Sequence, residues 1–153
     1  MYTAEESSRI KQQFWTSFGQ YMAPVLSAEN QKINWINYKT GIRHLYFRME
    51  ASSKMASISI DIMHKDAEHA AIIYKIFEDT RAALELNTGE AWEWDTSYIN
   101  EHGQSLSRIY KTLMPANIFK QTDWPAIISF FKPRLIALDR YWTEHKMIFK
   151  MSC

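Results

Sequence analysis

The sequence predicts an α+β fold in which one antiparallel sheet carries helices mainly on one face. Several segments alternate apolar and polar residues with the period of half-exposed strands. Other, longer segments repeat apolar residues every three or four positions, as amphipathic helices do. The strand-like segments follow one another through short turns, which favours hairpins. We therefore expect a single domain over residues 1–153, with five strands and three helices in the order α-β-β-β-α-β-β-α.

Length and composition agree with a compact domain. A chain of 153 residues with 46% hydrophobic and 23% charged residues lies close to the globular average. Aromatic residues make up 14% and include six tryptophans. One core rarely hides so many rings, so some of them are expected on an exposed patch or a dimer interface.

The first two predicted helices have recognisable ends. Apolar side chains follow one stripe over residues 5–22, and a proline ends that stripe. The second helix covers residues 66–87. Asp66 is suited to cap its first turn, and Gly89 provides a glycine stop.

The last predicted helix runs from about residue 123 to 150 and contains Pro133. A proline inside a helix removes a hydrogen bond and clashes with the preceding turn, so we expect a kink or break there. The helix is apolar over more than one stripe, so it is either sandwiched or meets another chain. A homodimer contact around Tyr141, Trp142 and Phe149 is one prediction.

The five predicted strands are separated by turns. Gly41 permits a positive φ angle between the first two strands, where a tight turn is expected. The third strand alternates isoleucine with serine and aspartate, which predicts one wet face. The strands are expected at residues 33–38, 42–50, 54–63, 90–95 and 105–114.

Charge and cysteine content indicate the compartment. The formal net charge is +1, but residues 108–153 hold eight Lys/Arg against three Asp/Glu, so the C-terminal third is basic. The only cysteine is Cys153, on a tail expected to be mobile. Without a disulfide framework, signal peptide or membrane span, the sequence predicts a cytoplasmic protein with no membrane association.

Four stretches resemble a bacterial family of unknown function, the domain-of-unknown-function family numbered 4268. The likeness extends over almost the whole chain and implies no established activity. Some relatives resemble this domain fused behind a nuclease-like module, which implies an accessory role near nucleic acid. No catalytic residue is carried over, because the family offers no accepted catalytic motif to map onto these positions. The chain also departs from the fused form, since it is expected to stand alone without a nuclease-like half. The stretches are "FWTSFGQYM" (14–22), "KINWINYKTGI" (32–42), "SRIYKTLMPANIFK" (107–120) and "DWPAIISFFKPRLIALD" (123–139).

Aromatic and basic residues alternate through the first predicted hairpin and return on the last strand. Such a surface can attract phosphates with its cations and stack a base on a ring. The alternative is a plain hairpin whose rings pack inward while its lysines keep the edge soluble. For Arg108 the plainer interpretation is an ion pair to Glu93 or Asp95 across the hairpin. The candidate binding residues are Trp35, Tyr38, Lys39, Arg43, Arg48, Arg108 and Lys111.

Catalytic signals are weak. Asp61, Glu93 and Asp95 lie on predicted strands, where carboxylates can hold a cation for phosphodiester cleavage. His64 and His69 are potential metal ligands, although their spacing of five does not match a helical zinc pair. The chain has four glycines and neither a phosphate-cradling loop nor a nucleophile elbow. We expect no cofactor.

These observations favour a non-enzymatic binding or accessory module that meets protein or nucleic acid through an aromatic-basic surface. A metal-dependent nuclease-like phosphodiesterase is the first alternative, with the three strand carboxylates as its site. A self-associating structural protein is the second.

Overall fold

A computed structural model describes residues 2–152, which form one α+β domain around a single antiparallel sheet. The α+β class is therefore confirmed. Within these residues the sheet has four strands rather than five, and there are four α-helices rather than three. Cys153, with its predicted mobile tail, lies outside the described residues. The elements are α1 (Ala4–Met22), β1 (Leu45–Ala51), β2 (Ala56–Ile62), α2 (Ala67–Asp79), α3 (Arg81–Thr88), β3 (Glu93–Ile99), β4 (Ser105–Leu113), η1 (Gln121–Asp123) and α4 (Trp124–Ser152).

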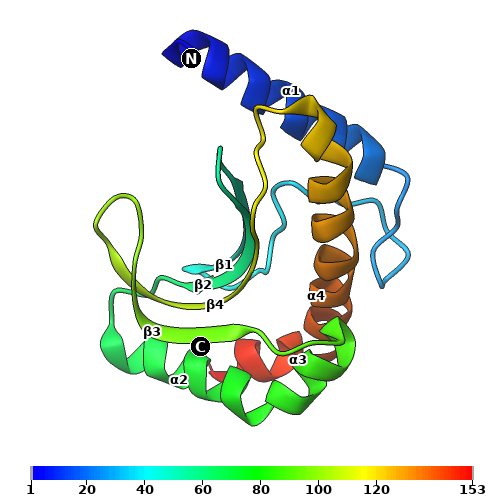
Figure 1. Ribbon diagram of the computed structural model, residues 1–153. Helices are drawn as coiled ribbons and strands as arrows, with labels where there is room; N and C mark the ends of the chain where they lie inside the picture. The colour runs from blue at the N-terminus through cyan, green and yellow to red at the C-terminus, as the bar shows by residue number, and fades with distance from the viewer. Residues whose placement is uncertain (1, 153) are drawn as a thin grey trace.

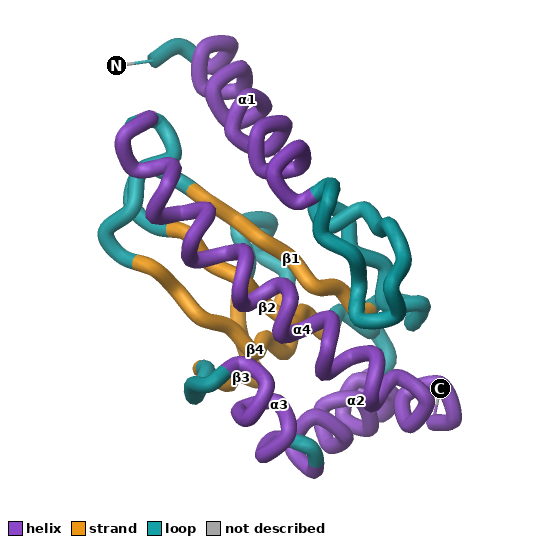
Figure 2. Tube along the Cα trace, turned by 90° about the vertical axis from the view of Figure 1, so that its right-hand side faces the viewer, coloured by secondary structure: helices purple, strands orange, loops and turns teal. Residues whose placement is uncertain are grey.

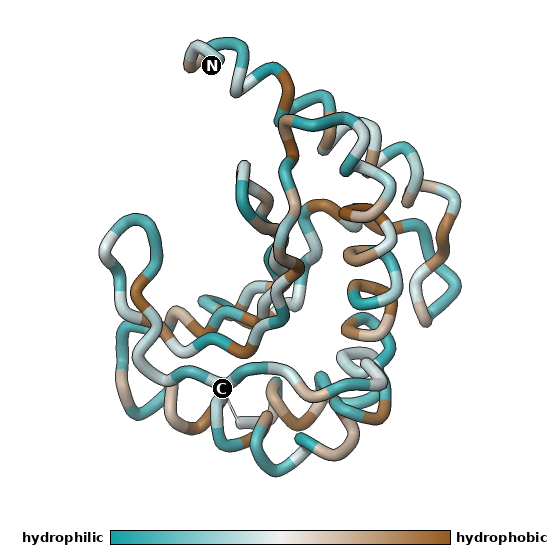
Figure 3. The backbone as a smooth tube through the Cα atoms, in the orientation of Figure 1, coloured by the Kyte–Doolittle hydropathy of each residue, from teal (hydrophilic) through white to brown (hydrophobic). Residues whose placement is uncertain are grey.

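The sheet is strongly curved, and its two faces differ. The strand order is β1-β2-β4-β3, with all neighbours antiparallel. Figure 1 shows α2, α3 and α4 on the convex side, and in Figure 2 the long helix α4 crosses diagonally over the strands. Hydrophobic and hydrophilic residues alternate along the strands (Figure 3). The apolar positions, such as Ile58, Ile60 and Ile62 of β2, belong to the core on the convex side.

The segment 33–38, a predicted strand, is instead an irregular turn. The side-chain oxygen Oδ1 of Asn34 accepts hydrogen bonds from the backbone N–H groups of Ile36 and Asn37, both at 3.1 Å. These local bonds replace the ladder of a strand. Trp35 is buried here, and its indole N–H donates to the carbonyl of Val25 at 2.9 Å. The missing fifth strand is explained by this turn.

The predicted helix 66–87 is divided in two at Thr80. Asp66 caps α2 by accepting the N–H of Glu68 at 3.0 Å, and Gly89 ends α3 with a φ angle of 73°. Both predicted ends are therefore confirmed. The break arises because Thr80 leaves helical geometry, with φ −106° and ψ 17°. Its hydroxyl donates back to the carbonyl of Ile76 at 2.8 Å, an alternative to continuing the helix.

Helix α4 continues through Pro133 as one helix, so of the predicted kink or break, the break does not occur. The ring of Pro133 is exposed, and in the same turn the guanidinium of Arg134 donates to the carbonyl of Phe130 at 3.0 Å. Pro133 has no N–H for the carbonyl of Ser129, four positions back, so the helix lacks one backbone hydrogen bond there. The helix is also held by packing on more than one side, because Phe131 lies against Phe14 of α1. No helix within residues 2–152 is long and apolar enough to cross a lipid bilayer.

The aromatic residues near the end of α4 are core residues. Tyr141, Trp142 and Phe149 are each at most 2% exposed. Phe149 packs on Phe77 of α2 at a ring-centroid distance of 4.6 Å. Because these three rings are buried within the chain, they do not form the predicted dimer surface.

Candidate functional site

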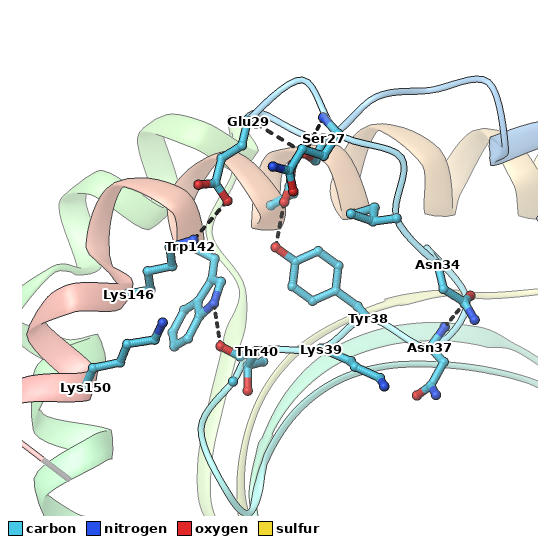
Figure 4. A pocket seen from close by; sticks show the side chains of 14 residues that line it. Ser27, Glu29, Asn34, Asn37, Tyr38, Lys39, Thr40, Trp142, Lys146 and Lys150 are labelled. Atoms are coloured by element: carbon cyan, nitrogen blue, oxygen red, sulfur yellow. Dashed lines mark hydrogen bonds and ion pairs between the residues drawn. The ribbon is translucent and has the colours of Figure 1, made fainter.

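A cleft of about 380 Å³ lies between the irregular segment 27–41 and the second half of α4 (Figure 4). The segment forms one wall, and α4 forms the other through Asp139, Trp142, Lys146 and Lys150. Most of the residues that line the cleft are polar or charged. We call it the lysine cleft, because three lysines line it.

Two tryptophans and a glycine fix the path of the segment. The indole N–H of Trp142 donates to the carbonyl of Thr40 at 3.0 Å, which ties the segment to α4. The next residue, Gly41, has a φ angle of 82°, a conformation that side-chain-bearing residues rarely adopt. A Cβ atom at Gly41 would lie 3.7 Å from Cε of Lys150, so the lysine stem passes close to the backbone here. Trp35 anchors the other end in the core.

Asp139 is the buried centre of the contact between the segment and α4. One carboxylate oxygen accepts the N–H of Ala28 at 2.7 Å, and the other accepts the hydroxyl of Tyr38 at 2.6 Å. Burial, followed by the hydrogen bond to Asp139, raises the pKa of Tyr38 far above its ordinary value. Tyr38 therefore remains a neutral hydrogen-bond donor at physiological pH.

Three lysines line the cleft, one from the segment and two from α4. Lys146 reaches across the cleft, and its Nζ lies 2.9 Å from Oε1 of Glu29 on the opposite wall. Lys39 and Lys150 form no ion pair with any carboxylate in residues 2–152, and Figure 4 shows both at the cleft. The two carboxylates of the lining are already engaged, Glu29 by Lys146 and Asp139 by its two donors. Two ammonium groups thus remain for an anionic ligand.

Comparison with known protein families identifies the family of this chain. The model of the family described as a domain of unknown function, DUF4268, matches residues 10–146. The chain belongs to the DUF4268 family. A search of curated proteins found no match, and neither did a search of solved structures. The match confirms the resemblance and covers both walls of the cleft in this DUF4268 domain except Lys150.

The predicted hairpin residues do not stay together in this DUF4268 domain. Tyr38 and Lys39 line the lysine cleft, as a binding role requires. Trp35 is 2% exposed and packs in the core, so its ring is unavailable for stacking. Arg43 is exposed in the turn before β1 but does not line the cleft. The first predicted hairpin therefore contributes partly to the core and partly to the cleft wall.

The remaining predicted cations lie elsewhere. Arg48 is on the concave face of the sheet, with its guanidinium 4.4 Å from the ring centroid of Tyr46. Lys111 stands opposite Ile58 on the convex side, where its Nζ is 4.0 Å from Glu90. The seven candidate residues therefore do not converge on one surface.

Arg108 is locked in a buried ion pair, and its partner is not one of the two predicted. Its Nε and Nη2 donate to the two carboxylate oxygens of Asp61 at 2.8 and 2.9 Å, and both side chains are almost fully buried. The guanidinium also lies 3.4 Å from Glu50 and 4.1 Å from the ring centroid of Tyr98. Asp95 faces Arg108 from the other neighbouring strand without pairing with it. The predicted pair with Glu93 or Asp95 is wrong because β2 supplies a closer carboxylate.

The predicted carboxylate site is not assembled as a cation site. In the sheet register, Arg108 stands between Asp61 and Asp95, and Glu93 stands opposite Tyr110. Both oxygens of Asp61 are taken by the guanidinium. In the part of the chain that the structure describes, no three Asp, Glu, His or Cys side chains are arranged to hold a metal ion. The geometry gives no support to the phosphodiesterase alternative.

His64 and His69 do meet, but as stacked rings. Their centroids are 4.9 Å apart with nearly parallel planes, and His44 approaches His64 at the same distance. Nδ1 of His69 lies 2.6 Å from Asp66, the cap of α2. That hydrogen bond lowers the pKa of the exposed Asp66 carboxyl. Ring stacking, rather than convergent nitrogens, defines this cluster.

Sequence reasoning missed the helical wall of the cleft. Asp139 was detectable, because it interrupts the apolar stripe of the last helix in "RLIALDRYW", four positions after Leu135. A carboxylate on a buried stripe requires partners, which makes it a candidate for a polar site. Lys146 and Lys150 carry no such signal, because helical lysines are common on solvated faces.

Proposed function

We propose that this DUF4268 domain is a non-enzymatic binding module that holds the phosphate backbone of single-stranded nucleic acid in the lysine cleft. The supporting observation is that Lys39, Lys146 and Lys150 all line one cleft beside Tyr38. Ammonium groups attract phosphates as point charges, and their effect is strongest where several face the same volume.

The rest of the lining fits a nucleic-acid strand. The amide side chains of Gln31 and Asn37 line the same cleft and can donate to phosphate, sugar or base-edge oxygens. The ring of Tyr38 lies at its wall, although its hydroxyl is held by Asp139. The cleft has a volume of about 380 Å³, which is typical of a small-molecule site. A cleft of this size suits one or two nucleotide units at a time.

The wider charge distribution and the family resemblance are consistent with this role. The C-terminal third of the chain is basic, and it supplies two of the three cleft lysines. Relatives that resemble this domain fused to nuclease-like modules imply an accessory position near nucleic acid. A binding module without its own catalytic centre suits such a position.

Fluorescence anisotropy with a labelled single-stranded DNA, recorded at a low and a high salt concentration, tests the proposal. The double variant Lys39→Ala/Lys150→Ala is expected to bind about tenfold more weakly and to reduce the salt slope by about two. The matched control is Lys65→Ala/Lys120→Ala, which removes two exposed lysines outside the cleft. Equal loss in the two double variants, or no binding by the parent at low salt, contradicts the proposal.

One observation favours self-association as a second candidate function. Beside the buried rings of α4, Met147, Ile148 and Met151 are 60%, 45% and 81% exposed. Apolar side chains grouped at the end of a helix favour contact with another copy. Sedimentation velocity over a range of concentrations, with Ile148→Ser as the test variant, distinguishes a dimer from a monomer. A monomer at every concentration removes this candidate.

A further inference from the structure

The concave face of the sheet has a composition different from that of the lysine cleft. The helices α2, α3 and α4 lie on the convex side, so this face is not covered by them (Figure 1). The register places Arg48, Ser59, Tyr110 and Glu93 in one row across the four strands. None of these residues lines the lysine cleft.

Arginine–tyrosine stacking recurs on the concave face. The guanidinium carbon of Arg48 lies 4.4 Å from the ring centroid of Tyr46, and that of Arg108 lies 4.1 Å from the ring of Tyr98. Both distances are in the range of favourable cation–π contacts. The face therefore already binds two cationic side chains of its own chain in this way.

Tyr110 is a third tyrosine of the same face, and it differs from the other two. Its ring is half-buried and lies 5.6 Å from the ring of Tyr98. Glu93 stands directly opposite on β3 and is exposed, with Asp95 two positions further along the strand. No lysine or arginine of residues 2–152 lies over the Tyr110 ring, and none pairs with Glu93 or Asp95.

The charge of the concave face is negative. Among the strand residues of this face, Asp61 neutralises Arg108, which leaves Arg48 beside the three carboxylates of Glu50, Glu93 and Asp95. A nucleic acid is repelled by such a face, whereas a cation gains from both the carboxylates and the ring. An aromatic ring flanked by carboxylates is a general arrangement for binding ammonium and guanidinium groups.

We propose that the concave face, at Tyr110, Glu93 and Asp95, binds the arginine side chains of a basic segment from a protein partner. One guanidinium would stack on Tyr110 as Arg108 stacks on Tyr98, while its N–H groups bind the carboxylate of Glu93. This inference is independent of nucleic-acid binding in the lysine cleft, because the two sites share no residue and have opposite charge.

A short fluorescent peptide of alternating arginine and serine is the probe, titrated into the full chain with anisotropy as the readout. The parent is expected to bind it, and a peptide with glutamate in place of arginine is expected not to bind. Glu93→Gln/Asp95→Asn is expected to weaken binding about tenfold. The control Glu68→Gln/Glu78→Gln makes the same charge change on exposed α2 residues and is expected to bind like the parent.

The ring is tested separately from the charge. Tyr110→Leu is expected to weaken binding about fivefold, whereas Tyr110→Phe, which keeps the ring, retains most of the affinity. Circular dichroism checks that each variant is folded. If Tyr110→Leu unfolds, the Glu93→Gln/Asp95→Asn variant and its α2 control test the proposal. The proposal is overturned if the parent does not bind the arginine peptide, if the α2 control loses as much affinity as Glu93→Gln/Asp95→Asn, or if both peptides bind equally.

Discussion

The hydroxyl of Tyr38 donates a 2.6 Å hydrogen bond to Asp139, a carboxylate that is 4% exposed on α4. This contact joins an irregular segment to a long helix across 101 positions of sequence. The segment has no strand or helix ladder of its own, so side-chain contacts of this kind hold it in place. The shape of the lysine cleft therefore depends on a buried polar contact.

The first prediction concerns that contact. Tyr38→Phe leaves Asp139 buried with the N–H of Ala28 as its remaining partner. A buried acceptor that loses a donor costs about 1–3 kcal/mol, so the free energy of unfolding should fall by that amount. Urea denaturation measures it, with Tyr21→Phe, an exposed tyrosine on α1, as the control. An unchanged midpoint for Tyr38→Phe would show that the contact contributes nothing.

The second prediction concerns the ion pair of the sheet. Arg108→Met leaves the fully buried Asp61 without its counter-ion, which should destabilise the protein by about 3–5 kcal/mol. Arg108→Met/Asp61→Leu replaces both charges with apolar groups and should recover most of that loss. Chemical denaturation of the parent, Arg108→Met, Asp61→Leu and the double variant completes a double-mutant cycle.

Additive losses in that cycle contradict a direct coupling between the two side chains. A recovery in the double variant shows that the two side chains are coupled and that the loss in Arg108→Met comes mainly from the unpaired buried charge of Asp61. A much smaller coupling is expected for the exposed Lys75–Asp79 bridge of α2, which serves as the comparison.

The parts of the fold that could be predicted from the sequence have local signals. The alternating isoleucines of β2, the Asp66 cap and the Gly89 stop each act within a few residues, and the structure has all three. The strand prediction for residues 33–38 was wrong because alternation of apolar and polar residues does not distinguish a strand from a turn held by Asn34. The break at Thr80 depends on the hydrogen bond from its hydroxyl to the carbonyl of Ile76. The spacing of apolar residues along the helix does not reveal such a bond.

The candidate site was less predictable because it joins distant segments. The sequence predicts Tyr38 and Lys39 as candidate binding residues, but Lys146 and Lys150, which line the same cleft, lie more than 100 positions away and resemble ordinary surface lysines. Arg108 was identified as exposed or paired across the β3–β4 hairpin, whereas its partner comes from β2. Strand order, which brings β2 beside β4, was the missing information.

The third prediction concerns alkaline pH. Burial raises the pKa of Tyr141 to about 12 from an ordinary value near 10.0. Because the folded pKa is the higher one, the stabilisation is fully present below pH 10 and is lost as the pH rises from about 10 to 12. The two-unit difference corresponds to about 2–3 kcal/mol.

Unfolding free energies measured from about pH 8 to pH 11 test the dependence. The parent should lose stability over the upper part of this range, and Tyr141→Phe should lose less because it has no phenol to ionise. Its baseline is expected to be lower, since the hydroxyl of Tyr141 also lies 2.7 Å from that of Thr80. Parallel curves for the parent and the variant contradict the assignment to Tyr141.

The fourth prediction is a gain of affinity. In the lysine cleft Glu29 occupies Lys146 at 2.9 Å, so an incoming phosphate competes with a carboxylate of the protein itself. Glu29 is half-exposed, and pairs of this kind contribute at most about 1 kcal/mol. Glu29→Gln frees the ammonium group and should tighten single-stranded DNA binding about twofold to fivefold.

Glu144→Gln, which removes an exposed charge from α4 outside the cleft, is the matched control. An equal gain in both variants indicates a general effect of net charge, and a loss in Glu29→Gln indicates that the glutamate shapes the cleft for its ligand rather than competing with it.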